Sequence, residues 1–458
     1  MAVVQTIRGE VRPMLALALP LVLAELGWMA MGIIDTIMVG RLPYAAVAMG
    51  AVSLGTAIFY TCTVFGGALL LGLDTVVSQA YGARNFDDCH RSLWNALYLC
   101  VPITVGSIAV NAGLAASLPR FGVNPDVLPF ATRYITILNW STPPLMLYFA
   151  LRRYLQGMAF VKPVMFALVS ANVINLAGNW ALIYGHWGFP AMGTDGSAWA
   201  TVVSRCYMAG VLVVALLVRE RGQVAGLFHV SFAPDWPRLR RLLHLGIPAA
   251  THVGLEMAVF AAATALAAKL DAASLAAHQI ALNAASLTFM VPLGISSAAA
   301  VRVGHRIGAR DPAGAGRAGW AAVACGVLFM AFGAAAFLAV PEQIARIYTP
   351  DRVVIQRSVT LLAIAAAFQL FDGCQIIAAG ALRGAGITRT PMLCNLFFYW
   401  FLGLPLGYAL CFKAGWGVAG LWTGLSIALI LIGCVLLLVW KQTVADVTRS
   451  AAAHEIAA

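Results

Sequence analysis

The chain has 458 residues, of which 61% are hydrophobic and only 10% are charged. A soluble domain carries about 25% charged residues, so this composition excludes a water-soluble globular protein and indicates a polytopic membrane protein. The net charge of +11 does not indicate nucleic-acid binding, because the basic residues occupy short loops between apolar segments, where they orient membrane helices.

Twelve apolar segments are each long enough to cross a bilayer, which takes about 20 residues of helix. They are 14–38, 46–71, 92–116, 128–150, 162–184, 194–218, 240–268, 273–299, 317–340, 355–381, 391–412 and 417–440. A long polar connection follows the sixth segment. It predicts an N-terminal six-helix lobe at 1–218, a cytoplasmic linker at 219–239, and a C-terminal six-helix lobe with a cytoplasmic tail at 240–458.

The basic residues are distributed unequally between the two faces of the predicted bundle. Of the 29 lysines and arginines, twenty lie on the face that carries both termini, eight lie on the opposite face, and Arg205 lies within a segment. Basic loops normally stay in the cytoplasm. We therefore expect a multi-pass protein of the inner (cytoplasmic) membrane with both termini in the cytoplasm.

The two halves repeat short motifs at a nearly constant offset. "ALPLVLAELG" corresponds to "GIPAATHVGL", which pairs Pro20 with Pro248, and "AYGARN" corresponds to "RIGARD", which pairs Gly82 with Gly308. The fold class expected is therefore all-α, with twelve transmembrane helices in two pseudo-symmetric six-helix bundles. Because six is even, the two copies share one orientation, as in transporters that alternate access by rocking one half against the other.

Four carboxylates lie within the predicted helices: Glu25, Asp35, Glu256 and Asp372. A charge at the bilayer centre costs at least about 2.5–3.5 kcal/mol, so such residues are functional candidates. Glu256 and Asp372 lie at similar depth in the seventh and tenth segments, and two carboxylates in one cavity repel each other until a proton or Na⁺ binds. The pair is therefore predicted to couple a cation to transport. The alternative is that each acid is satisfied locally and is structural.

Polar residues in the N-terminal half predict a second cluster. Asn175 and Asn179 are four residues apart, so they share a helix face, and Thr201 adds a hydroxyl in the sixth segment. With Asp35 they are predicted to form a polar site. Polar contacts that only hold helices together are the alternative interpretation.

Glu25 and Arg205 each lie about eleven residues into their segments, which are entered from opposite sides. Their depths therefore agree, and a structural ion pair is predicted, because either charge alone is costly.

Aromatic residues recur along the segments, and most are expected to pack helices or to lie at the membrane interface. Phe260, Phe289 and Phe368 are predicted to line a substrate cavity, where ring faces and a carboxylate attract a flat cation. His278 is expected to make an interhelical hydrogen bond, because no second histidine stands at metal-ligand spacing. We expect no metal site beyond Na⁺ at Glu256 and Asp372.

Several long motifs resemble the multidrug and toxic compound extrusion (MATE) family, and within it the bacterial NorM type. They are "ALPLVLAELGWMAMGIIDTIMVGRL", "GLDTVVSQAYGARN", "AAHQIALNAASLTFMVPLGISSAAAVRVGHRIGA" and "AAGALRGAGITRTPM". The resemblance implies an antiporter, not an enzyme, that expels cationic lipophilic drugs and dyes in exchange for Na⁺ or H⁺. It also implies that Glu256, Asp372 and Asp35 are the coupling acids. We expect no cofactor, a monomer, and cationic drugs and membrane lipid as its partners.

The chain departs from the resembled family at two places that bear on the ion. Asn175 and Asn179 stand where a sister branch has an aspartate. Phe368 stands one turn before the tenth-helix acid, where sodium-coupled relatives have a tyrosine, and it offers no oxygen to a hard cation. The choice between Na⁺ and H⁺ stays open on these residues.

Two other classes of protein are alternatives. A lipid-linked saccharide flippase of the same superfamily needs an arginine-lined cavity, and in the sequence only Arg205 lies deep. A polytopic membrane enzyme needs clustered His, Asp or Cys near one interface, whereas the eight histidines and nine cysteines are scattered and no nucleophile–base motif is present. A channel is disfavoured because duplicated lobes suit alternating access.

Overall fold

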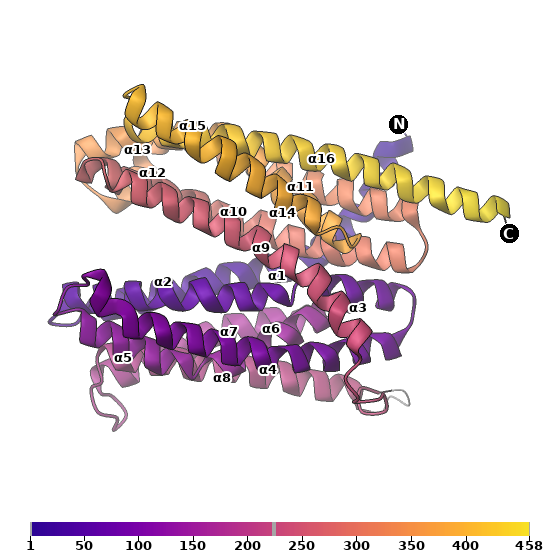
Figure 1. The fold of residues 1–458 in the computed structure, drawn as a ribbon, viewed down its shortest axis with the longest axis horizontal. Coiled ribbons are helices and arrows are strands. Elements are labelled where there is room, and N and C mark those ends of the chain that lie inside the picture. The colour runs from indigo at the N-terminus through magenta and orange to yellow at the C-terminus, as the bar shows by residue number, and fades with distance from the viewer. Residues whose placement is uncertain (1, 222–225, 458) are drawn as a thin grey trace. The chain divides into compact units, whose positions relative to one another are not determined.

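The computed structural model describes residues 2–221 and 226–457, and the side chains of 9–221 and 226–449. Residues 222–225 of the predicted linker, together with residues 1 and 458, lie outside the described residues. Every regular element in the described residues is a helix (Figure 1). The elements are α1 (Ala2–Val39), α2 (Ala45–Leu69), α3 (Gly72–Gly82), α4 (Phe86–Ser117), η1 (Leu118–Phe121), α5 (Leu128–Asn139), α6 (Thr142–Gly157), α7 (Lys162–Tyr184), α8 (Thr194–Glu220), α9 (Trp236–Ala267), α10 (Ala272–Gly308), α11 (Pro312–Ala339), α12 (Pro341–Tyr348), α13 (Arg352–Gly384), α14 (Arg389–Asn395), η2 (Leu396–Gly403), α15 (Leu404–Tyr408), η3 (Ala409–Lys413) and α16 (Gly417–Ala457).

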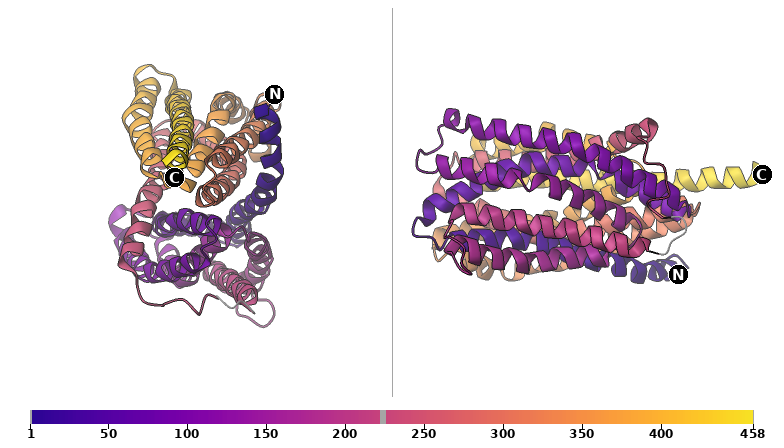
Figure 2. Two further views of the ribbon diagram at one scale, coloured as in Figure 1. Left: turned by 90° about the vertical axis from the view of Figure 1, so that its right-hand side faces the viewer. Right: turned by 90° about the horizontal axis from the view of Figure 1, so that it is seen from below.

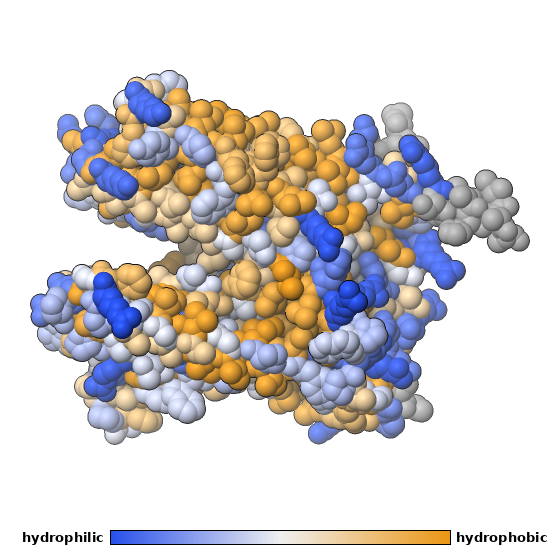
Figure 3. Space-filling model, in the orientation of Figure 1, coloured by the Kyte–Doolittle hydropathy of each residue, from blue (hydrophilic) through white to orange (hydrophobic). Residues whose placement is uncertain are grey.

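Eleven helical spans in the described residues are long and apolar enough to cross a membrane. The remaining predicted segment, 128–150, which is the fourth in chain order, forms two helices: α5 ends at Asn139 and α6 begins at Thr142. Pro143 and Pro144 explain the break, since a proline lacks the amide hydrogen that continues a helix. The predicted all-α membrane fold is confirmed. Apolar side chains cover the middle of the helices and hydrophilic ones gather at their ends (Figure 3).

Contacts divide the chain into two compact units, which differ from the predicted lobes in their boundaries. The N-terminal unit comprises Leu23–Tyr81 and Asn85–Ala250, and the C-terminal unit comprises Met1–Val22, Gly82–Arg84 and Thr251–Ala458. Helices run side by side within each unit, as the end-on view in Figure 2 shows.

The first half of α1 belongs to the C-terminal unit because it packs on α10. The buried carboxylate of Glu10 pairs with Arg302 and Arg306. Gly294 lies so close to the backbone of Val22 that a Cβ there would approach its amide nitrogen to 2.7 Å. These contacts place the residues up to Val22 in the C-terminal unit, although the sequence analysis assigned 1–218 to the N-terminal lobe.

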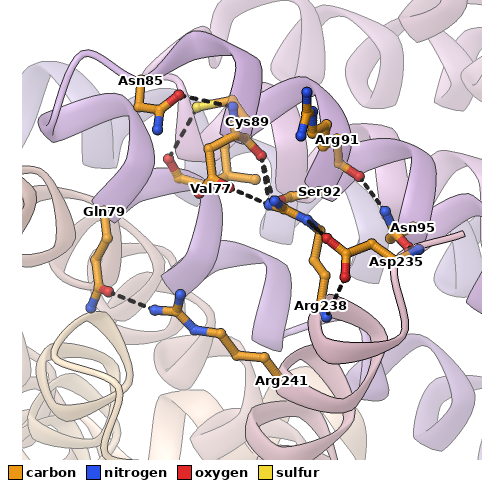
Figure 4. A network of polar contacts seen from close by, with 11 residues as sticks. Val77, Gln79, Asn85, Cys89, Arg91, Ser92, Asn95, Asp235, Arg238 and Arg241 are labelled. Atoms are coloured by element: carbon orange, nitrogen blue, oxygen red, sulfur yellow. Dashed lines mark hydrogen bonds and ion pairs between the residues drawn. The ribbon is translucent and has the colours of Figure 1, made fainter. Parts of the chain in front are cut away.

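The start of α9 belongs to the N-terminal unit because a polar network fastens it to α4 (Figure 4). The guanidinium of Arg238 donates to Asp88 and to the hydroxyl of Ser92, the latter at 3.0 Å. The Asp235 amide donates to Asn95 Oδ1 at 2.9 Å. The start of α9 is therefore anchored to α4, whose residues lie about 150 positions earlier in the chain.

The internal repeat predicted from the sequence is reproduced in local backbone conformation. Arg84 and Arg310 each have φ 56°, although neither is glycine. The next residue caps the following helix in both halves, because the side chain of Asn85 accepts from the Asp88 amide and that of Asp311 accepts from the Gly314 amide. Equivalent motifs thus make the same turn twice.

A second pair of turns follows the same pattern, but the residues at the key position differ. Ala159 after α6 has φ 58° and Gly386 after α13 has φ 86°. In both turns the next residue's amide bonds back to a carbonyl five residues earlier, Phe160 to Leu155 and Ile387 to Leu382, each at 2.8 Å. Only glycine adopts this left-handed conformation without steric cost.

Exchanging alanine and glycine at these two positions tests whether the left-handed backbone conformation is strained at alanine. Ala159→Gly is expected to raise the free energy of unfolding by about 0.5–1 kcal/mol, because it relieves left-handed strain, and Gly386→Ala to lower it by a similar amount. Thermal unfolding of the purified protein measures both. Gly106 provides the control, since it lies within α4 and a Cβ added there would meet no atom within 4 Å, so Gly106→Ala is expected to be neutral or stabilising. Equal effects of the two Gly→Ala changes would contradict the argument.

Small residues bring α13 against α10 in the C-terminal unit. A Cβ at Gly380 would lie 2.3 Å from the Ser296 carbonyl oxygen, and one at Gly384 would lie 2.3 Å from that of Ala300. The Ser296 hydroxyl also donates to the Ile376 carbonyl at 2.7 Å. Such close helix approach is typical of membrane bundles, and it fixes the position of α13 one turn from Asp372.

Candidate ion and substrate site

A cavity of about 470 Å³ lies within the C-terminal unit, between α9, α10, α13 and α16. Its size falls within the range of small-molecule sites. Two acids and four aromatic residues contribute to its wall: Glu256, Asp372, Phe260, Phe289, Phe368 and Trp422. No basic residue is among the lining residues in the described part of the chain. The cavity therefore combines negative charge with aromatic faces, a combination suited to an organic cation.

The two predicted coupling acids meet at this cavity. Glu256 reaches it from α9 and Asp372 from α13. The two carboxyl groups are close enough to interact electrostatically. The similar depths estimated from the sequence predicted that these two acids would meet, and both line this cavity. Their role in coupling stays a prediction.

Gln375 is a third polar residue at the acid pair, and the sequence analysis did not single it out. Its Nε2 donates to Glu256 Oε1 at 3.0 Å, and the side chain is fully buried. The sequence held a signal for it, because Gln375 follows Asp372 by three residues and therefore lies on the same helix face. An amide in that position bridges α13 to α9.

The three predicted cavity aromatics, Phe260, Phe289 and Phe368, all line the cavity. Met257 and Met290 lie beside them. Thioether side chains are flexible and polarisable and adapt to ligands of different shapes. The wall is thus suited to a range of flat apolar molecules rather than to one.

His278 holds two parts of the cavity wall together by hydrogen bonds, as expected for an interhelical contact. Its Nδ1 accepts from the Trp422 indole at 2.9 Å, and its Nε2 lies 2.9 Å from the Thr264 hydroxyl. An imidazole whose Nδ1 accepts carries its proton on Nε2, so Nε2 donates to Thr264. Thr264 in turn donates to the Phe260 carbonyl at 2.9 Å.

The predicted polar cluster of the N-terminal unit is assembled around Asp35. Asn179 Nδ2 donates to Asp35 Oδ1 at 2.6 Å, and the Thr201 hydroxyl donates to Asp35 Oδ2 at 3.1 Å. Asn179 Nδ2 also lies 3.2 Å from Asn175 Oδ1. All four side chains are buried. Every oxygen of the Asp35 carboxylate therefore has a donor from the protein itself.

The predicted ion pair between Glu25 and Arg205 is wrong. Glu25 pairs with Arg152 of α6, and both side chains are buried. Arg205 instead donates to the Ser141 hydroxyl at 2.5 Å, and its guanidinium lies 4.6 Å from the centre of the Phe59 ring. A cation–π contact and a hydroxyl thus replace the predicted carboxylate.

Helix geometry explains the error. The Asp35–Thr201 hydrogen bond sets a common level on the antiparallel helices α1 and α8. At a rise of 1.5 Å per residue, Arg205 lies about 6 Å beyond that level and Glu25 about 15 Å beyond it. The two residues therefore lie at levels about 9 Å apart, whereas counting eleven residues into each apolar segment placed them at the same level.

A bundle of membrane-length helices with a repeated half and a buried acidic cavity is the architecture of a polytopic membrane transporter. The MatE family profile matches the chain twice, at residues 20–181 and 248–409. The chain therefore belongs to the MatE family, and the two matches confirm the internal duplication.

Relatives match over nearly the whole chain. A protein of Mesorhizobium japonicum, named probable multidrug resistance protein NorM, is 36% identical over 95% of this chain and 94% of its own length. A Xylella fastidiosa protein of the same name is 34% identical over 96% of this chain and 93% of its own. The predicted resemblance to the NorM type is confirmed.

Solved structures share the fold at lower identity. The eukaryotic MATE transporter AtDTX14 has a TM-score of 0.83 at 20% identity, covering 97% of this chain and 100% of its own. A MOP superfamily transporter of Pyrococcus furiosus has a TM-score of 0.85 at 18% identity, covering 98% and 99%, and is described as having a binding pocket of reverse polarity. At this identity the likeness shows the fold alone, so the polarity of the pocket has to be taken from this chain's own residues.

Proposed function

We propose that this protein is a secondary active multidrug antiporter of the inner membrane, with both termini in the cytoplasm. It exports cationic lipophilic drugs and dyes in exchange for an inward flow of Na⁺ or H⁺. The observation that carries the proposal is the pair Glu256 and Asp372 in an aromatic cavity. The names of the relatives support multidrug efflux, and the excess of basic residues on one face supports the orientation.

Competition for the two carboxyl groups is sufficient to couple the fluxes. In the outward-open state an ion binds at Glu256 and Asp372, removes negative charge and weakens the attraction for a cationic drug. The drug leaves, the ion-loaded protein changes to the inward-open state, the ion dissociates, and the drug site regains its charge. Coupling requires that each ligand stabilise a different state, because a ligand that binds both states equally shifts neither.

Aromatic and thioether side chains account for breadth of specificity. Phe260 and Phe289 offer ring faces to a planar cation, while Met257 and Met290 adjust to its outline. Hydrophobic contact adds little discrimination between similar apolar ligands. Charge at the acid pair then selects cations over anions.

The charge of the cavity disfavours a flippase for lipid-linked saccharides, which would need cations to hold a phosphate. The two deeply buried arginines of the N-terminal unit are both engaged. Arg152 pairs with Glu25, and Arg205 contacts Ser141 and an aromatic ring. The residues that line the cavity in the described chain include two acids and no base.

Ethidium transport by the purified protein in liposomes tests the proposed function. We expect transport to follow an imposed Na⁺ gradient or an imposed pH gradient, and to stop when an ionophore dissipates that gradient. Protein-free liposomes are the control. Transport that is unaffected by both gradients would show that the protein is not an ion-coupled antiporter.

A further inference from the structure

A groove of about 570 Å³ lies on the surface of the N-terminal unit, between the end of α1 and the second half of α7. Its lining residues are Met38, Arg41, Val173, Leu176, Ala177, Trp180, Tyr184 and Trp187. Those on α7 recur every three or four positions, so they form one face of the helix. Asn175 and Asn179, which contact the Asp35 cluster inside the unit, lie on the opposite face. The groove is therefore separate from the interior of the bundle.

The apolar part of the groove has the length of one lipid acyl chain. At a helical rise of about 1.5 Å per residue, the stretch from Val173 to Tyr184 is about 16 Å long, which is half of the roughly 30 Å hydrocarbon core. Val173 is 65% exposed although it lies within a membrane-length helix. The same exposed apolar face continues along α7 through Val169 and Phe166. A face of this kind is turned towards lipid.

Aromatic side chains gather at the mouth of the groove. The Trp180 ring stacks on His186, with 3.9 Å between ring centres, and lies 5.3 Å from the Trp187 ring. The Tyr184 hydroxyl donates to the Met38 carbonyl at 2.6 Å, which fixes the end of α1 to α7. Trp187 is 70% exposed and has φ 58°, an unusual conformation for a bulky residue, so this turn holds its ring at the surface. Indole and phenol rings are typical of the level of the lipid headgroups.

Arg41 places a positive charge at the same mouth. Its side chain is exposed, and no acid is among the residues that line the groove in the described part of the chain. Arg133 and Arg357, by contrast, pair with the carboxylates of Asp195 and Asp271. A guanidinium presents its donors in a planar arrangement that matches two oxygens of a phosphate. The groove therefore joins an anion-binding group at headgroup level to an apolar channel along α7.

We propose that this groove binds one anionic phospholipid molecule, with its phosphate on Arg41 and one acyl chain along Val173 and Leu176. The indoles of Trp180 and Trp187 flank the lipid where its headgroup meets its chains. The site is distinct from the acidic cavity, and its charge favours an anionic amphiphile over a cationic drug. Because the lipid contacts both α1 and α7, it stabilises the native N-terminal unit. The proposal does not depend on the proposed transport activity.

Lipid titration of the full-length protein in detergent tests the proposal. The thermal unfolding midpoint is expected to rise with phosphatidylglycerol and to rise less with phosphatidylcholine at the same concentration, because the choline cation offsets the phosphate charge at Arg41. Native mass spectrometry is expected to show one retained phosphatidylglycerol molecule. Soluble glycerol 3-phosphate is expected to have no effect at the same concentration, since it has no acyl chain to occupy the groove.

Substitutions of Arg41 test the headgroup contact. Arg41→Gln is expected to raise the phosphatidylglycerol concentration for half-maximal stabilisation about tenfold or more, because charge-assisted hydrogen bonds to the phosphate are lost. Its unfolding midpoint without lipid is expected to match that of the wild type, because the side chain is exposed. Arg41→Lys keeps the charge without the planar donor arrangement, so an intermediate effect is expected. Arg120→Gln is the matched control, because Arg120 is exposed in η1, outside the groove.

A larger side chain in the groove tests the acyl-chain contact while Arg41 stays in place. Leu176 is 47% exposed and lines the groove, so Leu176→Trp is expected to fill the channel and to remove the retained lipid. Leu217→Trp is the matched control, because Leu217 is 40% exposed on α8 and is not among the groove's lining residues. It is expected to retain the lipid as the wild type does.

Four other results would overturn the proposal. Equal stabilisation by both lipids that Arg41→Gln leaves unchanged would show that Arg41 binds no headgroup. An Arg41→Gln protein too unstable to purify would show that Arg41 has a structural role instead. Stabilisation by glycerol 3-phosphate equal to that by phosphatidylglycerol would indicate a site for a free anion. A dimer that Leu176→Trp abolishes would show that a second copy of the chain covers the groove.

Discussion

Glu256→Gln and Asp372→Asn are each expected to abolish drug resistance while the protein remains in the membrane. Each change removes one negative charge from the cavity and keeps the size of the side chain. The ion and the drug then no longer compete for a shared pair of carboxylates, so the coupling between them is lost. Because couplings of this kind are worth about 1–3 kcal/mol, ethidium efflux from cells is expected to fall about tenfold or more.

Two other carboxylates serve as matched controls for that experiment. Glu342 in α12 and Asp446 in α16 have side chains that are 54% and 71% exposed, outside the cavity. Glu342→Gln and Asp446→Asn are expected to leave efflux unchanged. Immunoblots of membrane fractions check that all four variants are present in equal amounts. Full resistance in both cavity variants would exclude the competition mechanism.

Arg152→Met is expected to destabilise the N-terminal unit strongly. It leaves the Glu25 carboxylate buried without its partner. Removing one member of a buried ion pair typically costs about 3–5 kcal/mol. Thermal or denaturant unfolding of the purified protein measures the loss.

A double substitution distinguishes the loss of the ion-pair attraction from the cost of leaving the Glu25 carboxylate buried without a partner. Arg152→Met combined with Glu25→Leu is expected to recover most of the stability, because an apolar pair often replaces a buried ion pair without loss. Arg346→Met breaks an exposed pair with Glu342 and is expected to cost less than about 1 kcal/mol. An Arg152→Met protein as stable as Arg346→Met would contradict the assigned pairing.

The sequence predicted the membrane helices well because the signal is local. A run of about 20 apolar residues must form a helix in lipid, where unpaired backbone groups are too costly. The predicted span 128–150, which is divided between α5 and α6, contains Pro143 and Pro144, so this break is caused by neighbouring residues. Repeated turn motifs likewise predicted a repeated fold, because the same short sequence adopts the same turn, as at Arg84 and Arg310.

Placement of the acids was predictable in part, because depth along a helix follows from residue number. Glu256 and Asp372 were assigned to one cavity in this way, and Asp35 was grouped with Asn179 and Thr201. The same estimate failed for Glu25, because the boundaries of two apolar segments do not determine how far one helix is shifted along the other.

The sequence by itself thus determined which segments lie in the membrane, that the unit is repeated, and that four carboxylates, Glu25, Asp35, Glu256 and Asp372, lie within those segments. Only the tertiary structure decided which of these side chains meet. Glu25 pairs with Arg152, Gln375 bridges to Glu256, and Tyr399 packs against Phe260 from a third helix. Such contacts depend on the rotation and relative height of packed helices. Close approach at small residues such as Gly380 sets the rotation and height of each helix. A shift of one residue along a helix would therefore change which side chains face each other.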